Sequence, residues 1–415
     1  MTEVQCNTAD TTQAPVLAAL GICCALGASK QQVWQAAVAG SRAGMVWRDD
    51  LLLAGQAVVV GAVTEKLPQI DPAFAHLSSR NNQLAYCAYL QIAAEVQQAK
   101  QQYGAERIAV VLGSSTSGIA DGEDALQQRL NSGNWPADYH YQKQEMAAPA
   151  HFIAAVAGVS GPAYVISTAC SSSARALISA RNLLTSGLAD AVIVGGVDSL
   201  CRMTLQGFAA LESVAAGFCQ PFAEGRDGIN IGEGAALFLM LRQADVTAQQ
   251  PGAQQLIELA GAGAAADAYH MSAPHPQGRG AEAAIRQALA QAGVSASELG
   301  YINLHGTATP LNDAMESTVL QRLGADKVPA SSTKSMTGHT LGAAGAIEAA
   351  LCWLLLSDYN AAFALLPQVR DNPADAELPT LNFVLAGQQQ PLSLCLSNSF
   401  AFGGNNAAVI LRRQR

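Results

Sequence analysis

The chain has 415 residues, half of them hydrophobic and only 13% charged, so it is long and apolar enough to bury a large core. Its formal net charge of -9 argues against general binding to nucleic acid or to an anionic membrane, because both require a positive protein surface. The beginning of the chain is neither basic nor strongly apolar, and the nine cysteines form no C-x-x-C pair. We therefore expect a cytoplasmic protein with reduced thiols and no membrane segment.

The first two predicted strands each end in a turn or loop. Val16 to Leu26 is an apolar run that predicts a buried strand, which Gly27 ends before a helix. Ile108 to Leu112 predicts a second buried strand, and this strand runs into the small polar loop Gly113 to Gly118. Functional groups are often carried by loops of this kind, which a rigid scaffold positions.

A strand, a helix and a further strand are predicted next along the chain. Tyr164 to Ser167 predicts a strand that leads into Cys170. Beyond this cysteine, apolar residues from Leu177 to Leu184 recur at helical spacing, and Ala191 to Val194 predicts the returning strand. The succession is typical of a βαβ unit.

The second half of the chain repeats this order. Tyr301 to Leu304 leads into His305, and Pro329 to Thr333 leads toward His339. Leu392 to Leu396 then leads into a glycine-containing segment. The recurrence predicts an α/β fold built from two similar halves.

The connection between the halves is predicted in the polar, glutamine-rich segment from Gln243 to Gln255, which contains a Pro-Gly turn. We place the boundary near residue 250. The expected units are then residues 1–250, with the candidate nucleophile, and residues 251–415, with the two candidate histidines.

Cys170 is the first candidate for catalysis because it lies between a predicted strand and a predicted helix, in the sequence TACSSS. Unpaired N–H groups and the positive end of a helix dipole would favour a thiolate there. The alternative is a small buried cysteine like the other eight. The serines that follow Cys170 favour a helix start that lines a cavity.

His305 and His339 are the candidate partners of this cysteine, since both follow predicted strands and have small or hydroxylated neighbours. One such histidine could be structural, but two histidines and a cysteine in equivalent loops favour a shared site. Zinc is another use of these residue types, although Cys170, His305 and His339 lack the short spacing of a structural zinc site. Lys334 and Glu316 could form an ion pair that orients the two histidine loops, with an ordinary surface pair as the alternative.

Five segments together resemble the motifs of β-ketoacyl carrier-protein synthases, the elongating ketosynthases of the thiolase superfamily. They are TACSSS around Cys170, PFAEGRDGINIGEGAA at residues 221–236, HGTATPLND from His305, KSMTGHTLGAAG from Lys334, and FAFGGNN from Phe400. The resemblance implies the thiolase fold, with duplicated α/β halves in a layered α-β-α-β-α arrangement. It also implies a homodimer, with a heterodimer containing a related subunit as the alternative. The implied partner is an acyl carrier protein in its acyl and malonyl forms.

The resemblance implies a decarboxylative condensation that requires no cofactor. Cys170 would carry the acyl group, and His305 and His339 would donate to the enolate formed from a malonyl thioester. Lys334 would be a further catalytic residue, and Glu316 would support the site. A thiolase would instead be expected to have a second cysteine near the C-terminal glycine loop, whereas this loop reads SNSFAFGGNN and contains no cysteine.

Further residues are implied to bind substrate. Backbone N–H groups of Cys170 and Phe402 would form the oxyanion hole. Phe402 lies in the glycine loop at residues 397–407, and a loop of this kind can present N–H groups to an oxyanion, although ordinary turns use the same residues. Phe402 would also act as a gate. The remaining substrate-binding residues implied by the resemblance are Thr307, Thr309, Phe400 and, on the far wall of the acyl pocket, Thr116.

A structural cation is implied by some relatives at the positions of Asn303, Glu348 and Ser397, although oxygen-bearing residues on loops are common. No metal takes part in the chemistry that the resemblance implies. The motif residues themselves support a Cys-His-His site with no bound metal.

Three residues depart from the common pattern: Asn405 replaces a usual threonine, Arg175 a frequent histidine, and Ile229 a frequent phenylalanine. With the serine run after Cys170, these departures favour a specialised pathway such as an aryl polyene or another polyketide-like lipid, with fatty-acid elongation as the alternative. Two other functions of this fold are a non-elongating chain-length partner and a CoA-dependent acyltransferase. Retention of Cys170 argues against the first, and retention of Lys334 and both histidines argues against the second.

Overall fold

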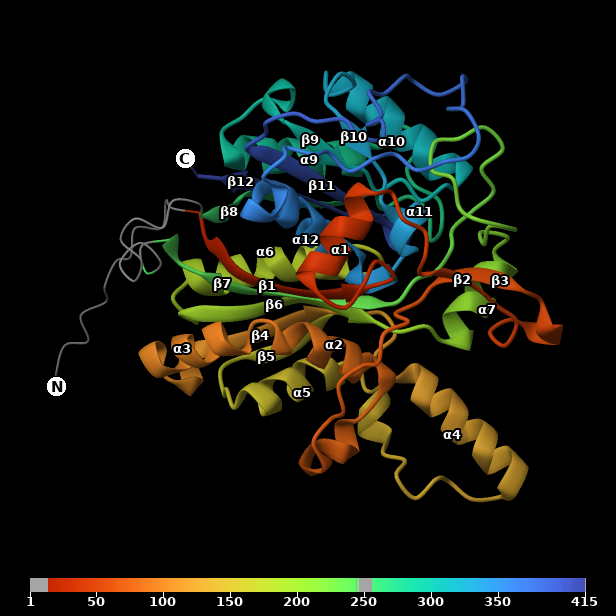
Figure 1. Ribbon diagram of the computed structural model, residues 1–415, viewed down its shortest axis with the longest axis vertical. Coiled ribbons are helices and arrows are strands. Elements are labelled where there is room, and N and C mark those ends of the chain that lie inside the picture. Colours follow the sequence, from red (N-terminus) through yellow and green to blue (C-terminus); the bar gives the residue numbers. More distant parts are fainter. Residues whose placement is uncertain (1–13, 244, 246–255, 415) are drawn as a thin grey trace.

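The computed structural model describes residues 14–243, 245 and 256–414, which form a mixed α/β fold (Figure 1). The strands are β1 (Val16–Cys24), β2 (Met45–Arg48), β3 (Val58–Gly61), β4 (Ile108–Gly113), β5 (Ala163–Ile166), β6 (Ala191–Asp198), β7 (Gly234–Leu241), β8 (Ile257–Ala266), β9 (Tyr301–Asn303), β10 (Ala330–Ser331), β11 (Leu394–Ala401) and β12 (Asn405–Arg413). The helices are α1 (Lys30–Val38), α2 (Arg80–Leu90), α3 (Ala93–Tyr103), α4 (Ile119–Ser132), α5 (Ala148–Ala157), α6 (Ser172–Thr185), α7 (Arg202–Ala210), α9 (Arg279–Ala292), α10 (Pro310–Arg322), α11 (Lys334–Thr337) and α12 (Ala344–Leu356). The predicted boundary near residue 250 lies outside the described residues.

The strand order shows the duplication directly. Among the described residues, the large sheet has the order β10-β9-β11-β12-β8-β1-β7-β6-β4-β5. Read from either edge toward the centre, each half presents its third, second, fourth, fifth and first strand. The pairings also agree, because β4 and β9 each lie between two parallel neighbours, whereas β7 and β12 each pair antiparallel on both sides. The predicted thiolase-like α/β fold is confirmed at this level.

The two halves are stacked in layers around two equivalent helices. The α6 helix connects β5 to β6, and the α12 helix connects β10 to β11, so they occupy matching places in the duplication. These helices pack against each other between the two parts of the sheet (Figure 1). The outer faces are covered by α2, α3 and α5 on one side and by α9 and α10 on the other. This is the expected α-β-α-β-α arrangement.

Most predicted strands are present with small shifts at their ends. The prediction for residues 392–396 was too short, because β11 continues through the polar residues 397–399 as far as Ala401. Only Phe402–Gly404 then forms the turn that precedes β12, with Gly403 and Gly404 at positive φ. Tertiary pairing with β9 and β12 explains why these polar residues adopt strand structure. Across the described residues, every helix is too short or too polar to cross a membrane.

Candidate active site

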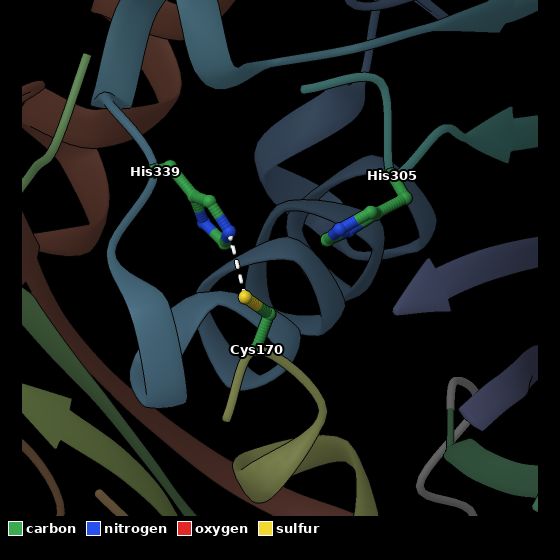
Figure 2. A group of neighbouring side chains, drawn as sticks. All are labelled: Cys170, His305 and His339. Carbon is green, nitrogen blue, oxygen red and sulfur yellow. Dashed lines mark hydrogen bonds between the residues drawn. The ribbon is translucent and has the colours of Figure 1, made fainter. Parts of the chain in front are cut away.

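Three strand-end loops bring the cysteine and both histidines together. Cys170 lies between β5 and α6, His305 follows β9, and His339 lies between β10 and α12 (Figure 2). The His339 Nε2 atom is 3.0 Å from the Cys170 Sγ atom. The two imidazole rings are nearly perpendicular, with their centroids 5.5 Å apart. The loops that were predicted to share a site therefore meet at one point.

Each of these loops contains a non-glycine residue in the left-handed backbone region. Ala169 immediately precedes Cys170 with φ 51°, and Leu341 follows the His339 position with φ 50°. Ala308, in the loop that carries His305, has φ 63°. Such a conformation costs about 1–2 kcal/mol per residue relative to the right-handed region. The surrounding packing must therefore impose these turns.

Burial governs the ionisation of Cys170. Its side chain is 5% exposed, and desolvation raises the pKa of the thiol to about 11, although Lys334 and the backbone of Phe402 act in the opposite direction. The cysteine does lie at the start of α6, as predicted. The expected thiolate is nevertheless wrong for the free enzyme, because the loss of solvation outweighs the nearby positive groups.

Both histidines are buried and neutral at physiological pH. His305 is 1% exposed and His339 is 2% exposed. Desolvation, followed by repulsion from Lys334, holds the pKa of each imidazole well below its ordinary value. A neutral imidazole has one N–H donor and one acceptor nitrogen, so either ring can donate a hydrogen bond to a developing oxyanion.

Lys334 and Glu316 both support the loop of His305, but they do so separately. The Lys334 ammonium pairs with Glu348 on α12, donates to the His305 carbonyl oxygen, and lies 3.4 Å from His305 Nδ1. The Glu316 carboxylate instead accepts from the N–H groups of His305 at 2.9 Å and Gly306 at 2.8 Å. The predicted Lys334–Glu316 ion pair is therefore wrong. Burial raises the pKa of Glu316 and of Glu348 to about 7.

The predicted substrate residues divide into two groups. Thr307, Thr309, Phe400 and Phe402 line the same cleft as the cysteine and both histidines. The hydroxyl oxygens of Thr307 and Thr309 are 2.9 Å apart, at hydrogen-bonding distance. Thr116 does not line this cleft: it is fully buried, and its hydroxyl donates to Asp198 at 2.9 Å. Its predicted place on the far wall of an acyl pocket stays a prediction.

The gate residue has an aromatic neighbour that sequence reasoning missed. Phe402 is half-buried, and its ring centroid is 5.5 Å from that of Phe208 on α7. Both rings line the cleft. Asp198 at the end of β6 was also missed. The available signal was an acid that ends the otherwise apolar strand AVIVGGVD.

Two possible cation sites differ in their fit to a metal ion. The donor atoms of the Cys-His-His group lie within 4.8 Å of one another, but the Lys334 ammonium beside His305 disfavours a further positive charge there. Asn303 Oδ1, Glu348 Oε2 and Ser397 Oγ are buried oxygens without a hydrogen-bond partner among the described residues. Oxygens of this kind are suitable ligands for a hard cation. Lys334 also pairs with Glu348, but there the carboxylate offsets the ammonium charge, so an ion bound at these oxygens would have a structural role.

A buried thiol, two neutral histidines and a duplicated α/β scaffold define an acyl-transferring condensing enzyme with a thiolase-like fold. Residues 16–246 match the family described as "Beta-ketoacyl synthase, N-terminal domain", and residues 256–362 match "Beta-ketoacyl synthase, C-terminal domain". The chain belongs to the β-ketoacyl synthase family. It is an acyltransferase that forms β-ketoacyl-ACP in fatty-acid or polyketide biosynthesis.

Individual relatives extend over most of the chain. Nodulation protein E of Rhizobium meliloti is 31% identical, covering 96% of this chain and 98% of the relative. The 3-oxoacyl-[acyl-carrier-protein] synthase 2 of Staphylococcus aureus (strain COL) is 32% identical, covering 83% and 84%. A solved structure, "Ketosynthase (ApeO) in Complex with its Chain Length Factor (ApeC) from Xenorhabdus doucetiae", is 44% identical with a TM-score of 0.89, covering 98% of this chain and 99% of that one.

Proposed function

We propose that this enzyme elongates a Cys170-bound acyl chain with malonyl units in a specialised polyketide-type pathway, of which aryl polyene synthesis is the candidate. The observation that carries the chemistry is the 3.0 Å contact between Cys170 Sγ and His339 Nε2, with His305 facing the same space. The 44% identity to the Xenorhabdus ketosynthase, over nearly the whole chain, supports a ketosynthase of the kind that works with a chain length factor.

The first half-reaction transfers the acyl group to the cysteine. Because burial keeps Cys170 protonated, its thiol must lose a proton as it attacks the incoming thioester, and His339 Nε2 is positioned to accept it. The carbonyl oxygen becomes negative, and the backbone N–H groups of Cys170 and Phe402 would donate to it. Collapse of the intermediate releases the carrier thiolate, which takes from His339 the proton that Cys170 had lost.

The second half-reaction forms the carbon–carbon bond. Loss of carbon dioxide from the malonyl group leaves an electron pair on its α-carbon, delocalised onto the thioester oxygen as an enolate. The N–H group of neutral His305 would stabilise that oxygen, and His339 would do so in the tautomer that carries its proton on Nε2, which differs from the tautomer that accepts the thiol proton in the first half-reaction. The α-carbon then attacks the acyl carbonyl, and the Cys170 sulfur leaves as a thiolate, which takes up one proton from solvent to restore the thiol. Atoms and electrons balance without a redox cofactor.

Lys334 and Glu316 would keep His305 in position during this step. Lys334 contacts both the carbonyl oxygen and the Nδ1 atom of His305, so its charge also keeps that imidazole neutral. Glu316 binds the N–H group of the same residue and of the next one. The polypeptide segment that carries the donor is thus held from two sides.

We also propose that the enzyme works with an acyl carrier protein and as a dimer. The Xenorhabdus ketosynthase is described in complex with a chain length factor, which supports a heterodimer with a related, non-elongating subunit. Sedimentation of the purified chain at micromolar concentration, alone and after co-expression with such a subunit, tests this proposal. If the chain forms a stable homodimer and does not bind the co-expressed subunit, the result would favour the homodimer expected from the sequence. The cytoplasmic location stays a prediction that cell fractionation would test.

The decisive experiment separates the two half-reactions. Cys170→Ala should abolish the acyl adduct seen by intact-mass spectrometry and abolish condensation, yet retain some carbon dioxide release from malonyl carrier protein. His305→Ala and His339→Ala should still form the adduct, more slowly for His339→Ala, while condensation falls by roughly 10²-fold or more. Cys24→Ala is the matched control, since Cys24 is also buried but lies in β1. Parental condensation by Cys170→Ala, or by both histidine variants, would overturn the mechanism.

A further inference from the structure

Asp198 is a fully buried carboxylate that lies outside the Cys-His-His group. One of its oxygens, Oδ1, accepts from the Ser114 hydroxyl at 2.8 Å, the Ser115 N–H at 2.7 Å, and both the N–H and hydroxyl of Thr116 at 2.9 Å. The other oxygen, Oδ2, accepts from the Gly342 N–H at 2.6 Å. One carboxylate therefore connects two loops that are far apart in the sequence.

Gly342 belongs to the turn that joins His339 to α12. Leu341, immediately before it, has a left-handed backbone with φ 50°. On the opposite side of this turn, the His339 N–H donates to the Asn230 carbonyl at 2.6 Å, and the Gly232 N–H donates to the His339 carbonyl at 2.9 Å. The turn is thus fixed at both ends, and Asp198 supplies the contact nearer to α12.

The loop bound to Oδ1 of Asp198 lies against the helix that follows Cys170. A methyl group on Gly113, at the beginning of that loop, would lie 2.3 Å from the backbone nitrogen of Ser173 in the first turn of α6. The Ser173 hydroxyl also accepts from the Ala346 N–H of α12 at 2.8 Å. The segments that follow Cys170 and His339 therefore meet around the end of β6.

We propose that Asp198 is a positioning residue that sets the distance between Cys170 Sγ and His339 Nε2. It touches neither reacting atom, and it acts through the backbone of the His339 turn on one side and through the loop beside α6 on the other. This inference rests on the proposed roles of Cys170 and His339.

The test variant is Asp198→Asn, because it changes the two sides of the carboxylate differently. The side-chain oxygen of asparagine can still accept from the loop at residues 114–116. Its NH₂ group would then face the Gly342 N–H, so two donors would oppose each other where a hydrogen bond exists now. The substitution therefore disturbs the His339 turn selectively while the size of the side chain is retained.

We expect slower chemistry with little change in substrate binding. The condensation kcat, divided by the fraction of Cys170 that an acyl thioester can label, should fall by about 10- to 100-fold, as for misplacement of reacting groups by about 1 Å. The KM for the malonyl carrier protein should stay within about threefold, because the cleft residues that would bind it are unchanged. The pH profile of Cys170 alkylation should also move, since the imidazole beside the thiol is displaced.

Asp190→Asn is the matched control. Asp190 immediately precedes β6, and Asp198 is its last residue. Each variant therefore removes one carboxylate, at opposite ends of the same strand. Asp190 pairs with Arg107 and Arg242. Its variant should lose stability but keep the parental kcat per labelled site and the parental alkylation profile.

Gly342→Ala approaches the same contact from the other side. The added methyl group would lie 2.8 Å from Asp198 Oδ2 and 2.7 Å from the Ser115 hydroxyl oxygen, so it should push the turn away while the carboxylate remains. Its kcat should fall as in Asp198→Asn.

The possible outcomes are distinct. Parental kcat and alkylation profile in folded Asp198→Asn and Gly342→Ala would overturn the positioning role. Insoluble protein from both variants, with soluble Asp190→Asn, would also overturn it by assigning the carboxylate to folding alone. If His339→Ala itself condenses at the parental rate, the proposed function has failed, and that result is separate from any result with Asp198.

Discussion

The buried pair of Lys334 and Glu348 predicts a separation of stability from activity. The two side chains are only 1% and 3% exposed, so the pair belongs with buried ion pairs, not with surface pairs worth less than about 1 kcal/mol. Glu348→Gln leaves the Lys334 ammonium buried without a countercharge. The free energy of unfolding should therefore fall by about 3–5 kcal/mol.

Lys334→Met leaves the opposite partner, and its cost should be smaller near pH 7. Burial already raises the pKa of Glu348 to about 7, so without Lys334 this carboxyl group can bind a proton and become neutral. The double variant Lys334→Met/Glu348→Leu contains two apolar side chains and no buried charge. Its stability should return to within about 1 kcal/mol of the parent.

Catalysis should not recover with stability in the double variant. The Lys334 contacts to His305 are lost in it, so condensation should stay at least about tenfold below the parent. Urea unfolding can be followed by tryptophan fluorescence, because Trp353 lies on α12 with Glu348 and donates to the Leu17 carbonyl at 2.9 Å. A Glu348→Gln variant within 1 kcal/mol of the parent, or a double variant as unstable as the sum of both single changes, would refute this reasoning.

Three more predictions follow from burial and close packing. Burial raises the pKa of Glu316 to about 7 from an ordinary 4.5, so the contribution of this group to stability is largest below pH 4.5 and is lost as pH rises to 7. In Glu316→Gln the loss of unfolding free energy over this range, measured by urea titrations, should become less steep by up to about 1.4 kcal/mol per pH unit. With the pKa of Cys170 raised to about 11, its alkylation rate by iodoacetamide should climb about tenfold per pH unit from pH 7 to 10, and a plateau near pH 7 would contradict that ionisation. Gly113→Ala should lower the free energy of unfolding by at least about 2 kcal/mol, since the methyl group would meet the Ser173 backbone. Gly207→Ala should raise the free energy of unfolding by up to about 1 kcal/mol, because Gly207 lies in the interior of α7 and its methyl group would meet no other atom. Equal melting temperatures of the two variants would count against both assignments.

The sequence was most informative where residues that are close along the chain act together. Cys170, His305 and His339 each follow an apolar strand, and the carboxyl ends of strands in such sheets gather functional side chains. The duplicated order of strands could also be read from apolar runs that end in polar loops. These local signals predicted a duplicated α/β fold and the three loops that meet, whereas the thiolase fold was predicted from the resemblance of the motif segments to a known family.

Long-range partners could not be read in the same way. Glu316 and Glu348 both lie on helices at similar distances along the chain from Lys334, and only the packing of α12 against the sheet selects Glu348 as its partner. The ionisation of Cys170 depends on how completely water is excluded, which no local pattern reports. Asp198 was missed because its five donors come from two distant loops.

The left-handed backbone conformations of Ala169, Ala308 and Leu341 imply that folding stability and catalytic activity place opposite demands on these positions. Glycine at any of these positions would relieve the unfavourable backbone conformation, although it would also increase the conformational entropy of the unfolded chain. Ala169 and Leu341 lie beside the two residues whose side chains are in contact across the site. Directed evolution for heat tolerance alone should therefore accept substitutions here that selection for turnover rejects, so both properties must be screened together.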